Sequence, residues 1–105
     1  MTRIEKGNPC QTVITTFEVN PATCDDVLEL LRATYSEVIS RQPGFISAGL
    51  HVNDAQTRIA NYSQWTRRED YQAMLRTVEM RRRNREINQL TKGFEPVMYD
   101  VLEVY

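Results

Sequence analysis

The sequence predicts a small α+β domain of four strands and two helices. Four segments alternate apolar and polar residues with a period of two, as strands do, and two carry apolar residues three and four apart, as amphipathic helices do. Turn-forming residues separate these segments, including Asn20-Pro21 and Pro43-Gly44. The chain has 105 residues, of which 41% are hydrophobic, and this length and composition are typical of one globular domain.

The first predicted strand covers residues 12–19 and follows a polar arm. Residues 1–11 contain Gly7 and Pro9, so we expect a flexible N-terminal arm there and a folded domain over residues 12–105. The strand is rich in β-branched side chains and alternates, so that one face carries Val13, Thr15, Phe17 and Val19.

A helix is predicted next, ending near Ser40. Thr23 is placed to cap it, and two aspartates follow where the helix dipole favours them. Pro43-Gly44 stops it. Its apolar stripe recurs at helical spacing through Val27, Leu31, Tyr35 and Val38.

Residues 45–52 and 57–65 predict a hairpin joined by a polar turn. In a regular pleat the two faces of the second strand carry Ile46, Ala48, Leu50 and Val52 against Phe45, Ser47, Gly49 and His51. The two faces of the third strand carry Ile59, Asn61, Ser63 and Trp65 against Arg58, Ala60, Tyr62 and Gln64.

A second helix and a fourth strand complete the chain. Thr66 is placed to cap this helix, with Glu69 at the capping-box position. Helical character continues through Leu90, with or without a break, and Gly93 ends it. Residues 95–105 alternate again and predict the last strand.

This order of elements is the ferredoxin-like βαββαβ pattern with an antiparallel four-stranded sheet. Right-handed crossovers place both helices on one face of the sheet. The other face carries Tyr62 and further apolar groups, and an uncovered apolar face is typical of an interface. We therefore expect a homodimer that packs through the open sheet face, as a dimeric α/β barrel.

Composition excludes several classes of function. The net charge is −1, and the third strand lacks the glycine–aromatic run of RNA-binding modules, so no nucleic-acid partner is expected. Neither a signal peptide nor a membrane span is apparent, which predicts a cytoplasmic protein without a membrane partner. Two cysteines and one histidine make no zinc pattern, and no Gly-x-Gly-x-x-Gly fingerprint occurs, so neither metal nor cofactor is expected.

Three motifs stand out: Pro43-Gly44-Phe45 at the start of the second strand, Asn61-x-x-x-Trp65 on the third, and Tyr71. Together they resemble the antibiotic biosynthesis monooxygenase family, and most of all its small anthrone oxygenases of aromatic polyketide pathways. The similarity covers most of residues 12–105. The family also includes quinol oxygenases, haem-degrading enzymes and members without known activity, so the resemblance alone does not decide the reaction.

The resemblance implies three catalytic residues. Asn61 and Trp65 lie four apart on a strand and share a face, which the resemblance turns toward the helices, where both would bind a phenol or quinone oxygen. Arg85 would stabilise negative charge as it develops. The structural interpretation is that Asn61 bonds to backbone, Trp65 fills the core and Arg85 lies on a solvated helix face.

The predicted substrate contacts are Tyr71, Leu50 and Tyr35. Leu50 departs from the family pattern, because the anthrone oxygenases carry a tyrosine there, and losing that hydroxyl indicates a different or more apolar substrate. His51 is a candidate base because it is a histidine, but it faces away from Leu50, so we expect a structural role for it.

The expected function is a cofactor-independent monooxygenase that oxidises an aromatic polyketide-like phenol, anthrone or hydroquinone to a quinone with dioxygen. The alternative is a non-catalytic dimeric small-molecule-binding or interaction protein of the same fold. That alternative is indicated if Asn61 and Trp65 bond only to protein and no cavity lies beside them. A haem-degrading enzyme is disfavoured, because residues 67–92 contain no histidine to ligate iron.

Overall fold

Four strands and three α-helices follow one another in the predicted order, and the region predicted as the second helix contains two of them. The structure is a computed structural model that describes residues 2–7 and 9–105. Over those residues the elements are β1 (Gln11–Glu18), α1 (Cys24–Glu37), a short 3-10 helix (Ile39–Arg41), β2 (Phe45–Val52), β3 (Arg58–Trp65), α2 (Arg68–Leu75), α3 (Val78–Leu90) and β4 (Gly93–Tyr99).

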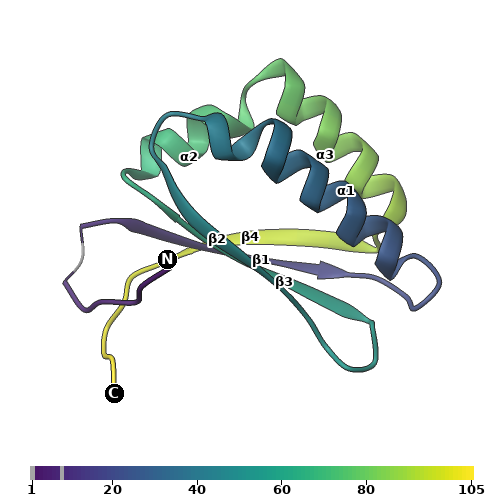
Figure 1. Cartoon of the computed structure of the whole chain (residues 1–105), viewed down its shortest axis with the longest axis horizontal. Helices are drawn as coiled ribbons and strands as arrows, with labels where there is room; N and C mark the ends of the chain where they lie inside the picture. The colour runs from purple at the N-terminus through teal and green to yellow at the C-terminus, as the bar shows by residue number, and fades with distance from the viewer. Residues whose placement is uncertain (1, 8) are drawn as a thin grey trace.

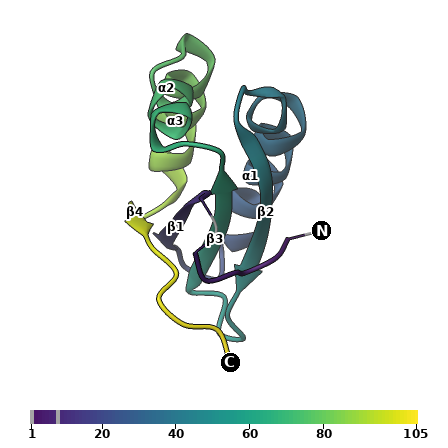
Figure 2. The same ribbon diagram turned by 90° about the vertical axis from the view of Figure 1, so that its left-hand side faces the viewer.

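The strands form one antiparallel sheet in the order β2-β3-β1-β4. β1 pairs along its length with β3 on one side and with β4 on the other. All three α-helices cover the same face of the sheet, and the opposite face has no helical layer (Figure 1 and Figure 2). The predicted ferredoxin-like α+β class is therefore confirmed.

The core lies between the helical layer and the sheet. Side chains on the helix-facing side of β1 and β3 meet the apolar stripes of the helices in two neighbouring clusters. One contains Val13, Trp65, Tyr71 and Met74, and the other contains Phe17, Leu31, Ile59 and Ile87. Burying an apolar side chain of this size contributes roughly 1.5–3 kcal/mol to folding.

A β-bulge at Ile46 changes which residues of β2 face the helices. The pairing shifts between Phe45, which lies opposite Trp65, and Ser47, which lies opposite Gln64. The regular pleat expected from the sequence put Phe45 and Leu50 on opposite faces, and this expectation was wrong. The bulge adds one residue to β2, so both side chains pack against the core below the helices.

The second helical region is divided by a turn at Thr77. Its hydroxyl caps α3, since Thr77 Oγ1 accepts a hydrogen bond from the Met80 N–H at 3.2 Å and donates one to the Met74 carbonyl at 2.9 Å. The N-cap position of α2 is Arg67, which makes no side-chain cap bond, so the predicted Thr66 cap is wrong. The two helices meet at this turn over the sheet (Figure 1).

The other helix and strand ends differ modestly from the prediction. Thr23 is the N-cap residue of α1, but its side chain makes no cap hydrogen bond and instead contacts Asn20. β4 ends at Tyr99, opposite Thr12 near the start of β1, and residues 100–105 are irregular. The predicted strand over 95–105 was too long, because a strand ends where its neighbour offers no further backbone partner.

Much of the predicted N-terminal arm lies on the side of the sheet away from the helices (Figure 2), whereas Thr2 lines a groove with residues of α1 and β2. Of this arm, residues 1 and 8 lie outside the described part of the chain. The Gln64 amide, which belongs to the open face of β3, donates a hydrogen bond to the Arg3 carbonyl. This contact explains why Gln64 is only 4% exposed although no helix covers it.

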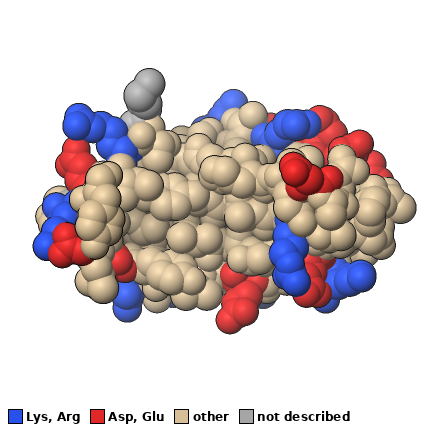
Figure 3. Space-filling model, turned by 90° about the horizontal axis from the view of Figure 1, so that it is seen from below, with Lys and Arg blue, Asp and Glu red and all other residues tan. Residues whose placement is uncertain are grey.

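The open face of the sheet is uncharged at its centre. Figure 3 shows this side, with acidic and basic side chains gathered at the margins. Tyr62, Ile14 and Val97 lie side by side across β3, β1 and β4, and Val97 and Tyr99 are 36% and 48% exposed. None of the helices in the described part of the chain has the length and apolar character needed to cross a bilayer.

Candidate functional site

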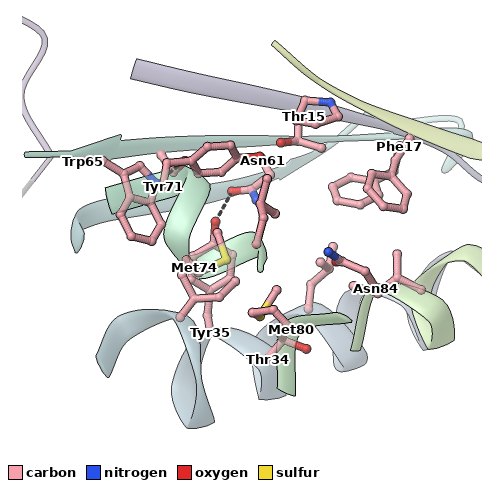
Figure 4. Close-up of a pocket in the computed structure, with 17 residues that line it drawn as sticks. Thr15, Phe17, Thr34, Tyr35, Asn61, Trp65, Tyr71, Met74, Met80 and Asn84 are labelled. Atoms are coloured by element: carbon pink, nitrogen blue, oxygen red, sulfur yellow. Dashed lines mark hydrogen bonds between the residues drawn. The ribbon is translucent and has the colours of Figure 1, made fainter. Parts of the chain in front are cut away.

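A partly enclosed cavity of about 50 Å³ lies between the helical layer and the sheet (Figure 4). Strands β1, β3 and β4 line it on one side, and all three α-helices line it on the other. Among the described residues that line it, none is acidic, basic or a histidine. A ligand would therefore meet aromatic walls and neutral polar groups, which are Thr15, Thr34, Tyr35, Asn61, Ser63, Trp65, Tyr71 and Asn84.

Asn61 places a buried amide beside this cavity. It lies opposite Thr15 of β1 and Leu50 of β2, so the sheet register turns its side chain toward the helices. The hydroxyl of Tyr35 on α1 donates a hydrogen bond of 2.7 Å to Asn61 Oδ1 (Figure 4). The Asn61 Nδ2 group makes no hydrogen bond to the described residues, and it remains available as a donor.

Trp65 is 1% exposed, and its indole donor is used within the protein. The Nε1–H donates to Ser63 Oγ at 3.2 Å, and Ser63 donates to the Val13 carbonyl at 3.3 Å. The Trp65 ring meets the rings of Phe45 and Tyr71 edge-on, at centroid distances of 5.5 and 5.7 Å. Asn61 and Trp65 therefore both bond to protein groups, as the binding-protein alternative requires, but a cavity lies beside them, which that alternative did not expect.

Two tyrosine hydroxyls in the cavity are proton donors rather than bases. Burial raises the pKa of Tyr35 to about 12. Burial also raises the pKa of Tyr71, whose side chain lies near Thr15. Because desolvation disfavours a phenolate, both groups stay neutral at physiological pH. The Tyr35 hydroxyl donates to Asn61, and the Tyr71 hydroxyl can donate to an oxygen of a ligand.

The structure does not bring Arg85 to the other predicted catalytic residues. It is exposed and does not line the cavity, whereas its neighbour Asn84 does. Asn84 follows Met80 by four residues and precedes Ile87 by three, so it shares the buried stripe of α3. This helical spacing is the signal in the sequence that could have identified Asn84 as a cavity residue. Arg83 forms ion pairs with Glu37 and Glu79, and its side chain is only 16% exposed, so it does not lie on a solvated face.

Leu50 lies in a second, larger hollow and not in the inner cavity. This groove of about 680 Å³ runs between α1 and β2. Phe45, Ala48 and Leu50 make its apolar part, and serines of α1, the 3-10 helix and β2 add polar groups. Tyr35 lines both the groove and the inner cavity, so it separates the two spaces.

The geometry of the described residues supports neither a metal site nor a place for His51 in the cavity. Within residues 2–7 and 9–105, no group of three or more His, Cys, Asp or Glu side chains is placed to hold a metal ion. His51 is exposed and lies opposite Ala60, on the face away from the cavity, with its Nδ1 3.2 Å from the Ala60 carbonyl oxygen.

Comparison with known sequences points to oxygenases. The profile of the family described as "Antibiotic biosynthesis monooxygenase" matches residues 11–85. Tetracenomycin-F1 monooxygenase of Streptomyces glaucescens is 30% identical over 63 residues, which is 60% of this chain. The match spans 56% of that relative's own length.

Solved structures give the same picture of the fold. A monooxygenase from the gene ActVA-Orf6 of Streptomyces coelicolor, solved in complex with nanaomycin D, is 27% identical with a TM-score of 0.76, over 90% of this chain and 89% of that chain. SnoaB, a cofactor-independent oxygenase from Streptomyces nogalater, is 19% identical with a TM-score of 0.73, over 90% of this chain and 95% of that chain.

Proposed function

Because the chain belongs to the antibiotic biosynthesis monooxygenase family, we propose that it is a cofactor-independent monooxygenase of a small polyketide-like phenol, anthrone or hydroquinone. The observation that carries the proposal is the cavity under the helices, where aromatic walls surround the Asn61 amide. Ligand sites of small molecules are typically apolar hollows with a few convergent polar groups. The lining of the inner cavity has this character, and the adjoining groove provides the space for rings.

The proposed reaction needs little acid–base chemistry from the protein. An anthrone-like substrate loses a proton and becomes an electron-rich anion, which Asn61 Nδ2 and the Tyr71 hydroxyl stabilise by donating hydrogen bonds to its oxygen. Dioxygen accepts electrons from this anion and forms a bond to the carbon of the CH₂ group that lost the proton. The resulting hydroperoxide loses water to leave a carbonyl, so one CH₂ group and O₂ become one C=O group and H₂O.

Apolar walls support this chemistry in a second way. Trp65, Phe17 and Met80 surround the polar groups with apolar surface, and a hydrogen bond to a developing anion is stronger where water is excluded. The relatives named above agree with the substrate class, since one is a tetracenomycin monooxygenase and another was solved with nanaomycin D.

We also propose that the protein works as a homodimer through the open face of the sheet. The row of Ile14, Tyr62 and Val97 forms an uncharged surface, and a second sheet is its simplest cover. The dimer would bury apolar surface that a domain of this size cannot bury alone.

Two observations favour the non-catalytic alternative. Asn61 and Trp65 already have protein partners, and a cavity of about 50 Å³ is too small for an aromatic ring as it stands. A protein that only binds small molecules would need no further group, so activity must decide between the two.

The deciding measurement is oxygen uptake with an anthrone or a naphthohydroquinone, without added flavin or metal. We expect wild-type uptake that gives a quinone and water from the anthrone, and a quinone and hydrogen peroxide from the naphthohydroquinone, which has no CH₂ group to oxygenate. Asn61→Ala should lose about a hundredfold, as loss of one donor to a developing anion usually does. Trp65→Phe should lose less, because its indole N–H is bonded to Ser63.

Variants on α3 test whether the predicted residue, Arg85, or the residue that lines the cavity in the structure, Asn84, contributes to activity. We expect Asn84→Ala to reduce uptake more than Arg85→Ala, because only Asn84 lines the cavity. Arg81→Ala, on the exposed side of the same helix, is the matched control. An oxygen uptake that is the same in Asn61→Ala as in wild type, or no uptake across a panel of phenols, would favour the non-catalytic alternative.

A further inference from the structure

The inner cavity and the outer groove meet at a single residue, Tyr35. The groove is about 680 Å³ and the cavity about 50 Å³. A cavity that holds one benzene ring is on the order of 150 Å³, and sites for larger ligands are roughly 300–1,000 Å³. The cavity therefore admits a molecule the size of water or dioxygen, whereas only the groove has room for a fused aromatic ring system.

Tyr35 presents a phenol to the amide of Asn61. Its hydroxyl donates to Asn61 Oδ1 at 2.7 Å, and its ring packs at a centroid distance of 6.0 Å from Phe45, which also lines the groove. In Figure 4 the Tyr35 hydroxyl reaches Asn61 from the helical layer. The bond thus shows the contact that Asn61 can make with a phenolic hydroxyl held against these aromatic walls.

We propose that Tyr35 is an internal stand-in for the phenol of the ligand, and that the groove and cavity become one site when a ligand phenol replaces it on Asn61. The ring system of the ligand then lies in the groove against Phe45 and Leu50. Its hydroxyl donates to Asn61 Oδ1 in place of Tyr35. The inference rests on the proposed function only for the class of ligand, a bicyclic or tricyclic phenol.

Two features of the chain fit this exchange. One phenol replaces another on the same acceptor, so the hydrogen bonds of Asn61 are the same before and after. The displaced Tyr35 hydroxyl gives up its bond to Asn61, and it can be solvated because Tyr35 also lines the groove. Leu50 adds apolar surface where the groove receives rings, and this gives the residue a role in binding without a hydroxyl.

The test is the affinity of the protein for a naphthol and for its methyl ether, measured by calorimetry without oxygen. The ether has the same rings but cannot donate to Asn61 Oδ1. In Tyr35→Phe the ring remains and the competing hydroxyl is gone, so the ratio of naphthol to ether affinity should rise severalfold, up to about tenfold. Tyr99→Phe, on the open face of the sheet, is the matched control and should leave this ratio unchanged.

A positional readout comes from the single tryptophan of the sequence. The indole NMR signal of Trp65, which lies beside Phe45, should shift when naphthol binds to wild type. A ratio that falls or stays constant in Tyr35→Phe, an unshifted Trp65 signal, or no binding to either protein would overturn the inference. A raised affinity ratio without oxygen uptake would refute the oxygenase function and support the phenol site. Oxygen uptake without a raised ratio would support the oxygenase function and refute the exchange at Tyr35.

Discussion

At the scale of single residues, the site depends on which polar groups already have partners. Asn61 could be singled out in the sequence because an amide on a buried strand face needs hydrogen bonds. That its Oδ1 is bonded to Tyr35, and that the Trp65 indole is bonded to Ser63, follows only from contacts between segments far apart in the chain. The place of Asn84 in the cavity lining likewise follows from tertiary structure, namely from which side of α3 faces the sheet.

The buried hydroxyl of Tyr35 predicts a pH dependence of stability. Its pKa rises from 10.0 to about 12 on folding, so the folded state holds the proton more tightly than the unfolded chain does. Stability is then complete below pH 10 and falls as pH rises toward 12, by about 2–3 kcal/mol for this group. Urea denaturation at several alkaline pH values should show a shallower decline for Tyr35→Phe than for wild type. An equal decline in both proteins would contradict this origin.

At the scale of elements, hydrophobic periodicity located the four strands and the two helical regions but not the turn that divides the second region, and local capping rules wrongly assigned Thr66 as the cap of α2. The sequence pattern favoured Thr66, with Glu69 three residues later. In the structure Thr66 lies before the N-cap of α2, and Thr77 caps α3 instead. A capping motif can be satisfied at several positions, and the packing of the whole helix on the sheet selects among them. The Ile46 bulge escaped prediction for a similar reason, since only the pairing of β2 with β3 reveals it.

The two threonines provide a direct comparison. Thr77→Ala removes the bond to the Met80 N–H and should lower the free energy of unfolding by about 1 kcal/mol. Thr66→Ala, at an exposed position, should change it by less than about 0.5 kcal/mol. Thermal or urea unfolding of both variants beside wild type measures the difference. Equal losses would mean that the cap of α3 does not contribute as its geometry indicates.

At the scale of the whole molecule, the helices cover one face of the sheet and leave the other without a helical layer, which we propose a second copy of the chain covers. The exposed apolar row on that face has no charged residue at its centre (Figure 3). The N-terminal arm covers one end of it through the Arg3–Gln64 contact. The cavity and the proposed interface therefore lie on opposite faces of one sheet, and β1 and β3 contribute side chains to both.

A charge on the open face should separate the proposed dimer. Val97→Glu places a carboxylate on the exposed row of β4, and burying an unpaired charge between two sheets is costly. We expect wild type to sediment as a dimer and Val97→Glu as a monomer in analytical ultracentrifugation. Val78→Glu is the matched control, because Val78 is 81% exposed on α3 and should leave the assembly unchanged. A monomeric wild type, or a dimeric Val97→Glu, would contradict the proposed interface.

Periodicity and turn residues were sufficient to predict the order of the elements, the antiparallel sheet and the single helical layer, because these follow from local patterns and from the fixed hand of the crossovers. Helical spacing placed Tyr71 on a buried stripe, strand alternation put Asn61 and Trp65 on one face, and the family resemblance turned that face toward the helices. The partners of Asn61 and Trp65, the exposure of Arg85 and the division of the site by Tyr35 were decided by the tertiary structure. All of these features have the same physical reason. The bulge in β2, the orientation of α3 and the hydrogen bond between α1 and β3 depend on residues that the chain brings together only when it is folded.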